Sequence, residues 1–338
     1  MLILGIETSC DETSVALLEH EAGNQFSIRA NLIASQTQAH ALFGGVVPEI
    51  ASRQHLEALN PLLAALQADT GVEWGQLDLV AVTYGPGLVG ALLVGLSGGK
   101  ALAYAHRIPC RPVNHVEGHI CSAFLAVPEL EFPMLSLVVS GGHTDLVMME
   151  DFGVYTRLGR TRDDAVGEAY DKVARALGLP QPGGPNLEVM ARSGAVKGLR
   201  FTPSNLEPSF DFSYSGLKTA ASQARLREPE RVGDIAAAFQ RAAISQLRHQ
   251  VSRALREFRP RTLGLCGGVA ANGALRTTLA ELATEEGVRF VVPPSILCTD
   301  NAAMIAAAGF FRHRAAGFPN FQVAALRFEA HSVLPVTV

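Results

Sequence analysis

Two segments of the chain share one plan, an apolar run, a short polar tip and a second apolar run. The first spans residues 2–18 (LILGIETSCDETSVALL), and its tip carries hydroxyls and carboxylates. The second spans residues 135–149 (LSLVVSGGHTDLVMM), with the tip Ser-Gly-Gly-His-Thr. Apolar runs joined by a polar turn predict β-hairpins. We therefore expect two structurally related halves, each opening with a hairpin, rather than a letter-by-letter repeat.

The segments that follow the hairpins alternate between strand and helix patterns. Residues 77–105 indicate a strand, a Gly-Pro-Gly turn and a helix, and residues 262–282 indicate a strand, a glycine loop and a helix. Residues 166–177 place apolar side chains at i, i+3, i+4 and i+7, which is typical of an amphipathic helix. Strands that alternate with helices predict the α/β class.

The length of the chain predicts more than one domain. At 338 residues, with 48% hydrophobic and 18% charged residues, it is globular and exceeds a single comfortable core. We expect one domain over residues 1–130, joined by the C-terminal helix near 301–315, and a second over residues 131–300.

The chain is expected to be cytoplasmic. Its N-terminus lacks a basic region and meets a carboxylate at Glu7, unlike a signal peptide. The uncharged stretch from Leu79 to Gly99 contains Pro86 and several glycines, which favour a buried strand, a turn and a packed helix over a membrane span. Five cysteines without a CxxC pair indicate reduced thiols.

Three loops that follow apolar strands could form a nucleotide site. They span residues 8–13, 140–144 and 267–272. Loops at strand ends of α/β proteins tend to converge where ligands bind, and glycines let backbone N–H groups approach a phosphate. No GxxxxGK[ST] motif is present, so a P-loop fold is not supported. For each loop taken alone, the alternative is an ordinary tight turn.

A pair of histidines indicates a metal site. His115 and His119 are four residues apart, a spacing that places both imidazoles on one face of a helix. With Asp300 they would form the two-histidine, one-carboxylate set that binds zinc or ferrous iron and leaves coordination positions open. The alternative is that these histidines only form hydrogen bonds within the fold. Cys298 is a softer candidate ligand, for which packing is the preferred role.

The position of Glu117 argues against a zincin protease. In HExxH the glutamate directly follows the first histidine, whereas here it lies two residues on, roughly 200° around the helix from His115. Its side chain is expected to point away from the metal.

Ten segments occur in the order found in the bacterial TsaD family of tRNA threonylcarbamoyladenosine biosynthesis proteins, which is related to archaeal and eukaryotic Kae1. The resemblance covers residues 3 to about 310 and rests on ETSCDET, FGGVVPEIASRQH, GPGLVGALLVG, HVEGH, SGGHT, GEAYDK, PGGP, FSYSGLKT, CGGVAAN and CTDNAAM. It implies the two-lobed actin, hexokinase and Hsp70-like (ASKHA) fold, with the two hairpins as phosphate loops.

The resemblance also implies an activity and a set of site residues. The family transfers a threonylcarbamoyl group from threonylcarbamoyl-adenylate to N6 of the adenosine just 3′ of the anticodon, in tRNAs that read codons beginning with A, and releases AMP. His115, His119 and Asp300 would hold one Fe²⁺ or Zn²⁺ ion. Asp11 and Glu12 map to a loop linked with nucleotide turnover, with ATP or ADP as further nucleotides. The adenylate would be bound by Val138, Val139, Ser140, Gly141, Gly142, Asp171, Gly184, Asn272 and, more weakly, Glu188.

Other activities stay open at this point. The phosphate hairpins are compatible with a small-molecule kinase or ATPase of the same fold, and the family's former label, O-sialoglycoprotein endopeptidase, suggests a metalloprotease. A nucleotide-gated scaffold is the non-enzymatic alternative.

The charge of the chain bears on its partners. The net charge of −4 provides no overall basic field for tRNA, so docking is expected to be shared with partner proteins. The resemblance points to a TsaB homologue and the ATPase TsaE, with TsaC supplying the adenylate. Arginines of the helix over residues 234–258 could contact RNA, although a solvated face is the preferred reading. The stretch Leu88–Leu96 and the helix near His55 could form a partner surface, although core burial is preferred for both.

Overall fold

The computed structural model describes residues 1–41, 43, 45–196 and 198–336. Gly44, part of the segment FGGVVPEIASRQH, lies outside the described residues. The chain divides into two compact units. Unit 1 contains Met1–Leu130, Asp151–Val154 and the segment from Thr299 onward, and unit 2 contains Glu131–Glu150 and Tyr155–Cys298.

The sheet of unit 1 has the strand order β3-β2-β1-β4-β5. β1 pairs antiparallel with β2 and parallel with β4, so that Gly5 lies opposite both Ala16 and Ala81. The strands are β1 (Leu2–Glu7), β2 (Glu12–His20), β3 (Phe26–Ser35), β4 (Leu79–Gly85) and β5 (Cys110–Asn114).

The second sheet repeats this topology. Its order is β10-β9-β6-β7-β8, with β6 antiparallel to β7 and parallel to β9. The strands are β6 (Met134–Val139), β7 (Thr144–Asp151), β8 (Val154–Arg160), β9 (Thr262–Cys266) and β10 (Arg289–Val291). Both predicted hairpins, β1–β2 and β6–β7, are confirmed. The α/β class and the related construction of the two halves are confirmed as well.

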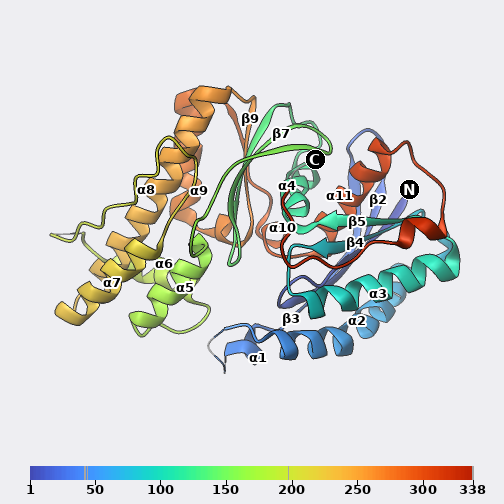
Figure 1. The fold of residues 1–338 in the computed structure, drawn as a ribbon, viewed down its shortest axis with the longest axis horizontal. Helices are drawn as coiled ribbons and strands as arrows, with labels where there is room; N and C mark the ends of the chain where they lie inside the picture. Colours follow the sequence, from blue (N-terminus) through green and yellow to red (C-terminus); the bar gives the residue numbers. More distant parts are fainter. Residues whose placement is uncertain (42, 44, 197, 337–338) are drawn as a thin grey trace. The chain divides into compact units, whose positions relative to one another are not determined.

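Helices cover both faces of the first sheet, which explains why β1 is a nearly continuous apolar run. Figure 1 shows α2 and α3 on one side and α4 and α11 on the other. Leu4, Ile6 and Val82 belong to the buried core that the α2 and α3 side shares with the sheet. The helices are α1 (Thr37–Ala41), α2 (Pro48–Thr70), η1 (Trp74–Gln76), α3 (Val89–His106), α4 (His115–Ala126), α11 (Ala302–Ala315) and η3 (Val323–Leu326).

The helices of unit 2 enclose a second core. Val166, Ala169, Tyr170 and Val173, on one stripe of α5, are buried in it, as the helical periodicity predicts. The helices are α5 (Val166–Ala176), α6 (Gly183–Ser193), α7 (Ser215–Arg227), α8 (Val232–Phe258), η2 (Gly268–Ala271), α9 (Gly273–Glu286) and α10 (Ser295–Cys298).

Helix α11 lies unusually close to β1. A Cβ atom added at Gly5 would be 2.1 Å from the carbonyl oxygen of Ala302, so only glycine fits there. The sequence predicts an N-cap for this helix at Thr299 or Asp300, since both residue types favour that position. This prediction is wrong by one or two residues: Asn301 is the cap, and its Oδ1 accepts from the N–H of Met304 at 3.0 Å. Since an amide oxygen satisfies the first turn, the Asp300 carboxylate is not needed as a cap.

The stretch from Leu79 to Gly99 forms β4, a turn and the first part of α3, as predicted. Within the described part of the chain, no helix combines the length and apolarity that crossing a membrane requires.

Candidate metal centre

Helix α4 begins with a metal-ligand candidate. Asn114, the last residue of β5, caps the helix, and its Oδ1 accepts from the N–H groups of Val116 at 2.9 Å and Glu117 at 3.4 Å. His115 therefore occupies the first turn and His119 the next, on the same side of the helix. Both histidines are buried. The predicted helical placement of the pair is confirmed.

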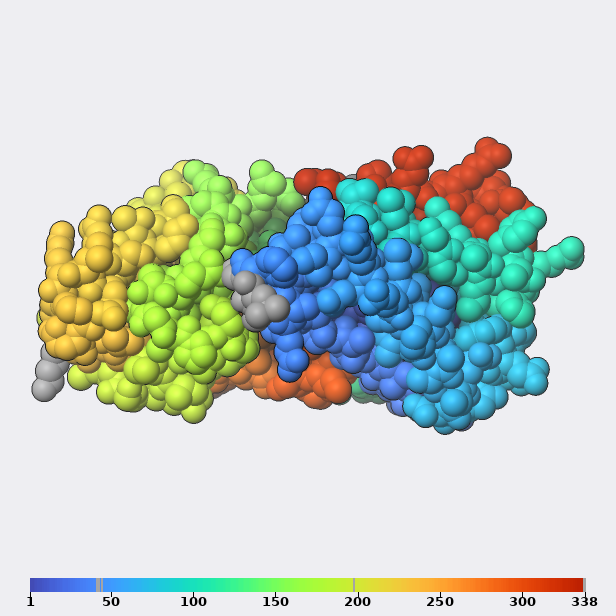
Figure 2. Space-filling view, turned by 90° about the horizontal axis from the view of Figure 1, so that it is seen from below, coloured from blue at the N-terminus to red at the C-terminus, as the bar shows by residue number. Residues whose placement is uncertain are grey.

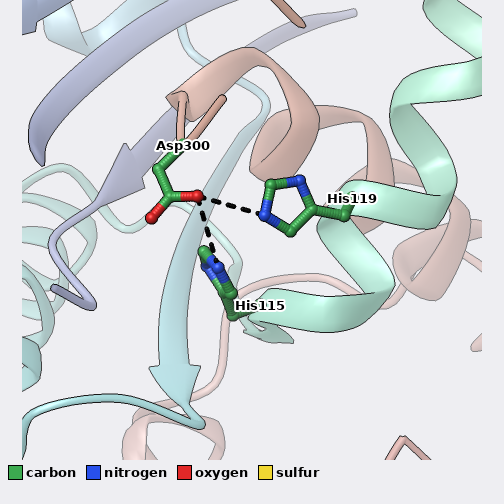
Figure 3. A group of neighbouring side chains, drawn as sticks. All are labelled: His115, His119 and Asp300. Atoms are coloured by element: carbon green, nitrogen blue, oxygen red, sulfur yellow. Dashed lines mark hydrogen bonds and ion pairs between the residues drawn. The ribbon is translucent and has the colours of Figure 1, made fainter. Parts of the chain in front are cut away.

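The two imidazoles converge on the carboxylate of Asp300 (Figure 3). Asp300 Oδ1 lies 3.1 Å from Nε2 of His119 and 3.5 Å from Nε2 of His115. One potential ligand atom from each of the three residues lies within 4.8 Å of the other two. The Asp300 side chain is 19% exposed, which leaves one side of the group open. Two imidazole nitrogens and a carboxylate oxygen that meet in this way fit Zn²⁺ or Fe²⁺.

Charge at the group favours a cation. Burial alone would lower the pKa of His115, but the carboxylates of Asp300 and Glu7 outweigh burial and raise this pKa to about 9. The pKa of His119 is lowered, because burial outweighs its hydrogen bond to Asp300. Without a metal, the group therefore holds a proton on His115 near neutral pH, at a place where a divalent ion could replace it.

Asp11 and Glu12 are the acidic part of the first hairpin tip. Burial raises the pKa of Glu12 to about 9, and the negative charges of Asp300 and Asp11 add to the effect. The Ser35 hydroxyl donates to Glu12 at 3.3 Å, an interaction that opposes this shift only weakly. The charge of Asp300 thus acts on Glu12, and a bound cation would reduce the repulsion between these carboxylates.

Glu117 lies on the metal helix but is directed elsewhere. Its carboxylate is fully buried and accepts a hydrogen bond from Nε of Arg312, on α11. The expectation that it points away from the histidine pair is confirmed. It is therefore not placed as the general base of a zincin.

Glu7 is a partner of the histidine pair that our sequence analysis did not identify. Its Oε2 lies 3.0 Å from Nδ1 of His115, and its pKa is lowered because His115, through charge and hydrogen bonding, outweighs the effect of burial. The available signal was a carboxylate at the end of an otherwise apolar strand, where it must find buried partners.

Cys298 packs inside the fold, as the sequence analysis favoured over a role as a metal ligand. Its thiol is buried and donates to the carbonyl of Pro293 at 3.2 Å. Among the described residues, the cluster able to hold a metal consists of His115, His119 and Asp300.

In unit 2, two of the predicted loops are neighbours. The run from Val138 to Gly142 covers the end of β6 and the hairpin tip, where Ser140 Oγ accepts from the N–H of Gly142 at 3.3 Å. β9, which pairs with β6, leads into the loop at 267–272. Gly267 has a φ of 90°, and an added Cβ would lie 2.3 Å from the Val139 carbonyl oxygen. This close approach requires glycine.

The other adenylate candidates of unit 2 form two contacts between elements. Asp171, on α5, accepts from the N–H of Gly184 at the start of α6 at 3.0 Å. Glu188, on α6, accepts from the N–H of Gly273 at 3.1 Å. Asn272 caps α9 through the N–H of Leu275 at 3.0 Å. The structure thus links each of these three residues to the start of α6 or α9.

Two solved structures share the fold. A full-length HypF in a phosphate- and nucleotide-bound form superposes with a TM-score of 0.62 at 12% identity, over 93% of this chain and 46% of that one. HypF of T. kodakarensis gives a TM-score of 0.65 at 13% identity, over 97% and 49%. At this identity the likeness concerns the fold, which is α/β of the ASKHA type.

Sequence relatives are much closer. The profile of the TsaD family, described as tRNA N6-adenosine threonylcarbamoyltransferase, matches residues 27–307. Proteins of that name from Halalkalibacterium halodurans and Symbiobacterium thermophilum are each 50% identical over 319 residues. The alignments cover 93% of this chain and 91% and 92% of the relatives, respectively. The chain therefore belongs to the TsaD family of tRNA N6-adenosine threonylcarbamoyltransferases.

Proposed function

We infer that this protein transfers the threonylcarbamoyl group of threonylcarbamoyl-adenylate to N6 of the adenosine 3′ of a tRNA anticodon. The observation that carries the inference is the group of His115, His119 and Asp300 in a chain 50% identical to enzymes of that name. The kinase and protease alternatives are not favoured by these relatives, and the direction of Glu117 opposes the protease.

The reaction needs positioning more than activation. The carbonyl carbon of the threonylcarbamoyl group is bonded to the adenylate phosphate oxygen in a mixed anhydride, which is already reactive. N6 of adenosine forms a bond to this carbon, the carbon–oxygen bond to phosphate breaks, and AMP leaves with the electron pair while N6 loses a proton. We propose direct transfer without a covalent enzyme intermediate, because aligning two bound substrates lowers the barrier of such a step.

We propose that His115, His119 and Asp300 bind one Fe²⁺ or Zn²⁺ ion. When bound, the ion would supply Lewis-acid polarisation of the threonylcarbamoyl oxygens. The exposed edge of Asp300 is where substrate would approach the group. Asp11 and Glu12, whose carboxylates share the field of Asp300, would act on the nucleotide phosphates or on a second cation during nucleotide turnover.

We assign adenylate binding to the strand-end loops of unit 2. An added Cβ at Gly141 or Gly142 would meet open space, so a ligand can approach the backbone of this tip closely. The carboxylates of Asp171 and Glu188 hold the backbone at Gly184 and Gly273 in place. The first turns of α6 and α9 would then form the surface that binds the adenosine part of the adenylate. Asn272 completes this group.

We propose that tRNA docking is shared with partners. Two arginines of α8 pair with carboxylates: Arg248 lies 2.6 Å from Glu285 and Arg256 lies 2.7 Å from Glu286. This pairing reduces the basic surface that α8 offers to RNA. The resemblance assigns the remaining roles to a TsaB homologue, TsaE and TsaC. None of the five cysteines, all of which lie in the described part of the chain, forms a disulfide, which fits a reducing cytoplasm.

The outer side of α2 and α3 is our candidate surface for a partner protein. Figure 2 shows these helices, coloured blue and teal, from their exposed side. Leu56 on α2 and Leu93 and Tyr104 on α3 are each at least half exposed, whereas Leu92 and Leu96 are buried. The stretch from Leu88 to Leu96 thus contributes both to the core and to an apolar surface.

The test is a reconstituted modification assay. The protein is combined with threonylcarbamoyl-adenylate, an unmodified tRNA and the TsaB and TsaE homologues, and threonylcarbamoyladenosine is quantified by mass spectrometry. Since loss of a metal ligand costs more than the 10–100-fold typical of an outer partner, His119→Ala should reduce the rate by more than about 100-fold. Glu117→Gln, on the same helix, is the control and should stay active. An inactive wild type with all components present would defeat the proposal.

A further inference from the structure

Glu7 is a fully buried carboxylate held by three donors from three parts of unit 1. The N–H of Ser9, just after β1, donates to Oε1 at 2.5 Å. The hydroxyl of Thr83, on β4, donates to Oε2 at 2.6 Å. Nδ1 of His115, at the start of α4, lies 3.0 Å from the same Oε2. Both oxygens of Glu7 therefore have a defined acceptor role.

This donor set requires a carboxylate specifically. Both oxygens meet donors, so the amide of glutamine would turn its NH₂ group toward either the Ser9 N–H or the pair formed by Thr83 and His115. A buried carboxylate is a costly way to stabilise a fold, because apolar residues of similar volume often do as well. The group thus calls for a role besides stability.

The role follows from the orientation of His115. In the neutral ring that can bind a metal, an Nδ1–H that donates to Glu7 leaves the lone pair of Nε2 directed toward Asp300, 3.5 Å away. Without an acceptor at Nδ1, the ring could carry its proton on Nε2 and donate it to Asp300, which removes the lone pair that a metal needs. A carboxylate behind a metal-binding histidine fixes both the tautomer and the ring orientation.

The second histidine lacks such support. Nδ1 of His119 is buried and has no hydrogen-bond partner within the described part of the chain. Ser9 Oγ, at 3.1 Å, is a further neighbour of Nδ1 of His115, but a neutral hydroxyl fixes the tautomer less firmly than a carboxylate. Glu7 is consequently the main residue that orients the pair of His115 and His119.

We propose that Glu7 is a positioning residue for the metal centre, which holds His115 in the Nδ1–H tautomer and so raises the affinity of the site for divalent metal. The proposal rests on the proposed metal-binding role of His115, His119 and Asp300. It predicts that neutralising Glu7 weakens metal binding even though Glu7 itself is not a ligand.

The experiment measures the Zn²⁺ affinity of the full chain by competition with a chromophoric chelator, in wild type, Glu7→Gln, Glu117→Gln and His115→Ala. Glu117 is the matched control, since it is also fully buried, also charged and on α4, but pairs with Arg312. We expect Glu7→Gln to bind Zn²⁺ about 10–100-fold more weakly, as is typical when a partner of a metal-binding histidine is removed. Glu117→Gln should bind like wild type.

A spectroscopic readout separates positioning from general loosening. In the zinc-bound protein labelled with ¹⁵N-histidine, the wild type should show a protonated Nδ1 on His115 with a hydrogen-bonded proton. In Glu7→Gln that proton signal should shift or exchange with solvent, and in Glu117→Gln it should be unchanged. An unchanged signal in Glu7→Gln contradicts the proposal.

The remaining outcomes are distinguishable. Unchanged zinc affinity in folded Glu7→Gln, or equal losses in Glu7→Gln and Glu117→Gln, overturns the role of Glu7 while leaving the metal centre intact. A wild type that binds no Zn²⁺, or a His115→Ala protein that binds it normally, overturns both proposals. If Glu7→Gln does not fold, Thr83→Val takes its place, because it removes one donor to Oε2 and keeps the charge. A smaller loss of affinity is expected there, and wild-type affinity overturns the proposal.

Discussion

Replacing Gly5 with alanine tests whether the close packing of helix α11 against β1 sets the position of Asp300. The new Cβ would lie 2.1 Å from the carbonyl oxygen of Ala302, whereas carbon and oxygen in contact stay about 3.3 Å apart. The first turn of α11 must therefore move by roughly 1 Å. Asp300 precedes Ala302 by two residues, so the shift reaches the metal centre.

Two effects of Gly5→Ala can be given a magnitude. Forcing a methyl group into a packed core costs about 1–3 kcal/mol, and for a unit of this size Tm should fall by about 2–12 °C. Ligand distances in metal sites tolerate about 0.2 Å, so a shift several times larger should weaken Zn²⁺ binding by roughly 10-fold or more. Calorimetry measures the first effect and chelator competition the second.

Gly309→Ala is the matched control for this experiment. It overpacks the same helix, because the new Cβ would lie 2.3 Å from Cβ of Ala81, but two turns farther from Asp300. We expect lower stability with nearly normal Zn²⁺ affinity. Wild-type Tm and wild-type affinity in Gly5→Ala would refute the argument that β1 and α11 set the position of Asp300.

Three further predictions concern charge. Because the pKa of His115 is about 9 in the metal-free protein, a proton competes with the metal ion below that pH. The Zn²⁺ affinity should therefore rise by about tenfold per pH unit up to about pH 9 and then level off. Zinc titrations at several pH values in non-coordinating buffers measure this. Burial raises the pKa of Asp145 to about 6, above its unfolded value, so this group reduces stability as pH rises from about 4 to 6. Asp145→Asn should therefore stabilise the protein at pH 7, by at most about 3 kcal/mol in denaturant titrations, and a less stable variant would contradict this. Arg248→Ala, which breaks the ion pair with Glu285, should change tRNA modification less than about twofold, since exposed pairs contribute little; a loss above about tenfold would show that α8 contacts tRNA.

The parts of the fold that could be predicted from the sequence are those that follow from patterns among residues close together in the chain. Apolar runs joined by a polar tip predicted both hairpins, and the four-residue spacing placed His115 and His119 on one face of α4. The N-cap of α11 was placed one or two residues early, since Thr, Asp and Asn all cap helices and three of them follow one another there.

The rest depended on contacts between distant residues. Asp300 is 181 residues from His119, and no periodicity connects the two. The chemistry of a two-histidine, one-carboxylate set suggested the link, and the family resemblance supported it. Two contacts depend on how α11 and β1 pack against α4: that of Arg312 with Glu117 and that of Glu7 with His115. Tertiary packing of this kind decides which buried carboxylates meet which donors, and a single sequence does not record it.

The repeated strand order of the two sheets has an evolutionary consequence. The same hairpin occurs twice, but its tip carries Asp11 and Glu12 in one copy and Gly141 and Gly142 in the other. Carboxylates attract cations, whereas bare backbone amides attract anions. If the halves descend from one ancestral unit, duplication allowed one hairpin tip to attract cations and the other to attract anions. A single copy of the hairpin could not have done both.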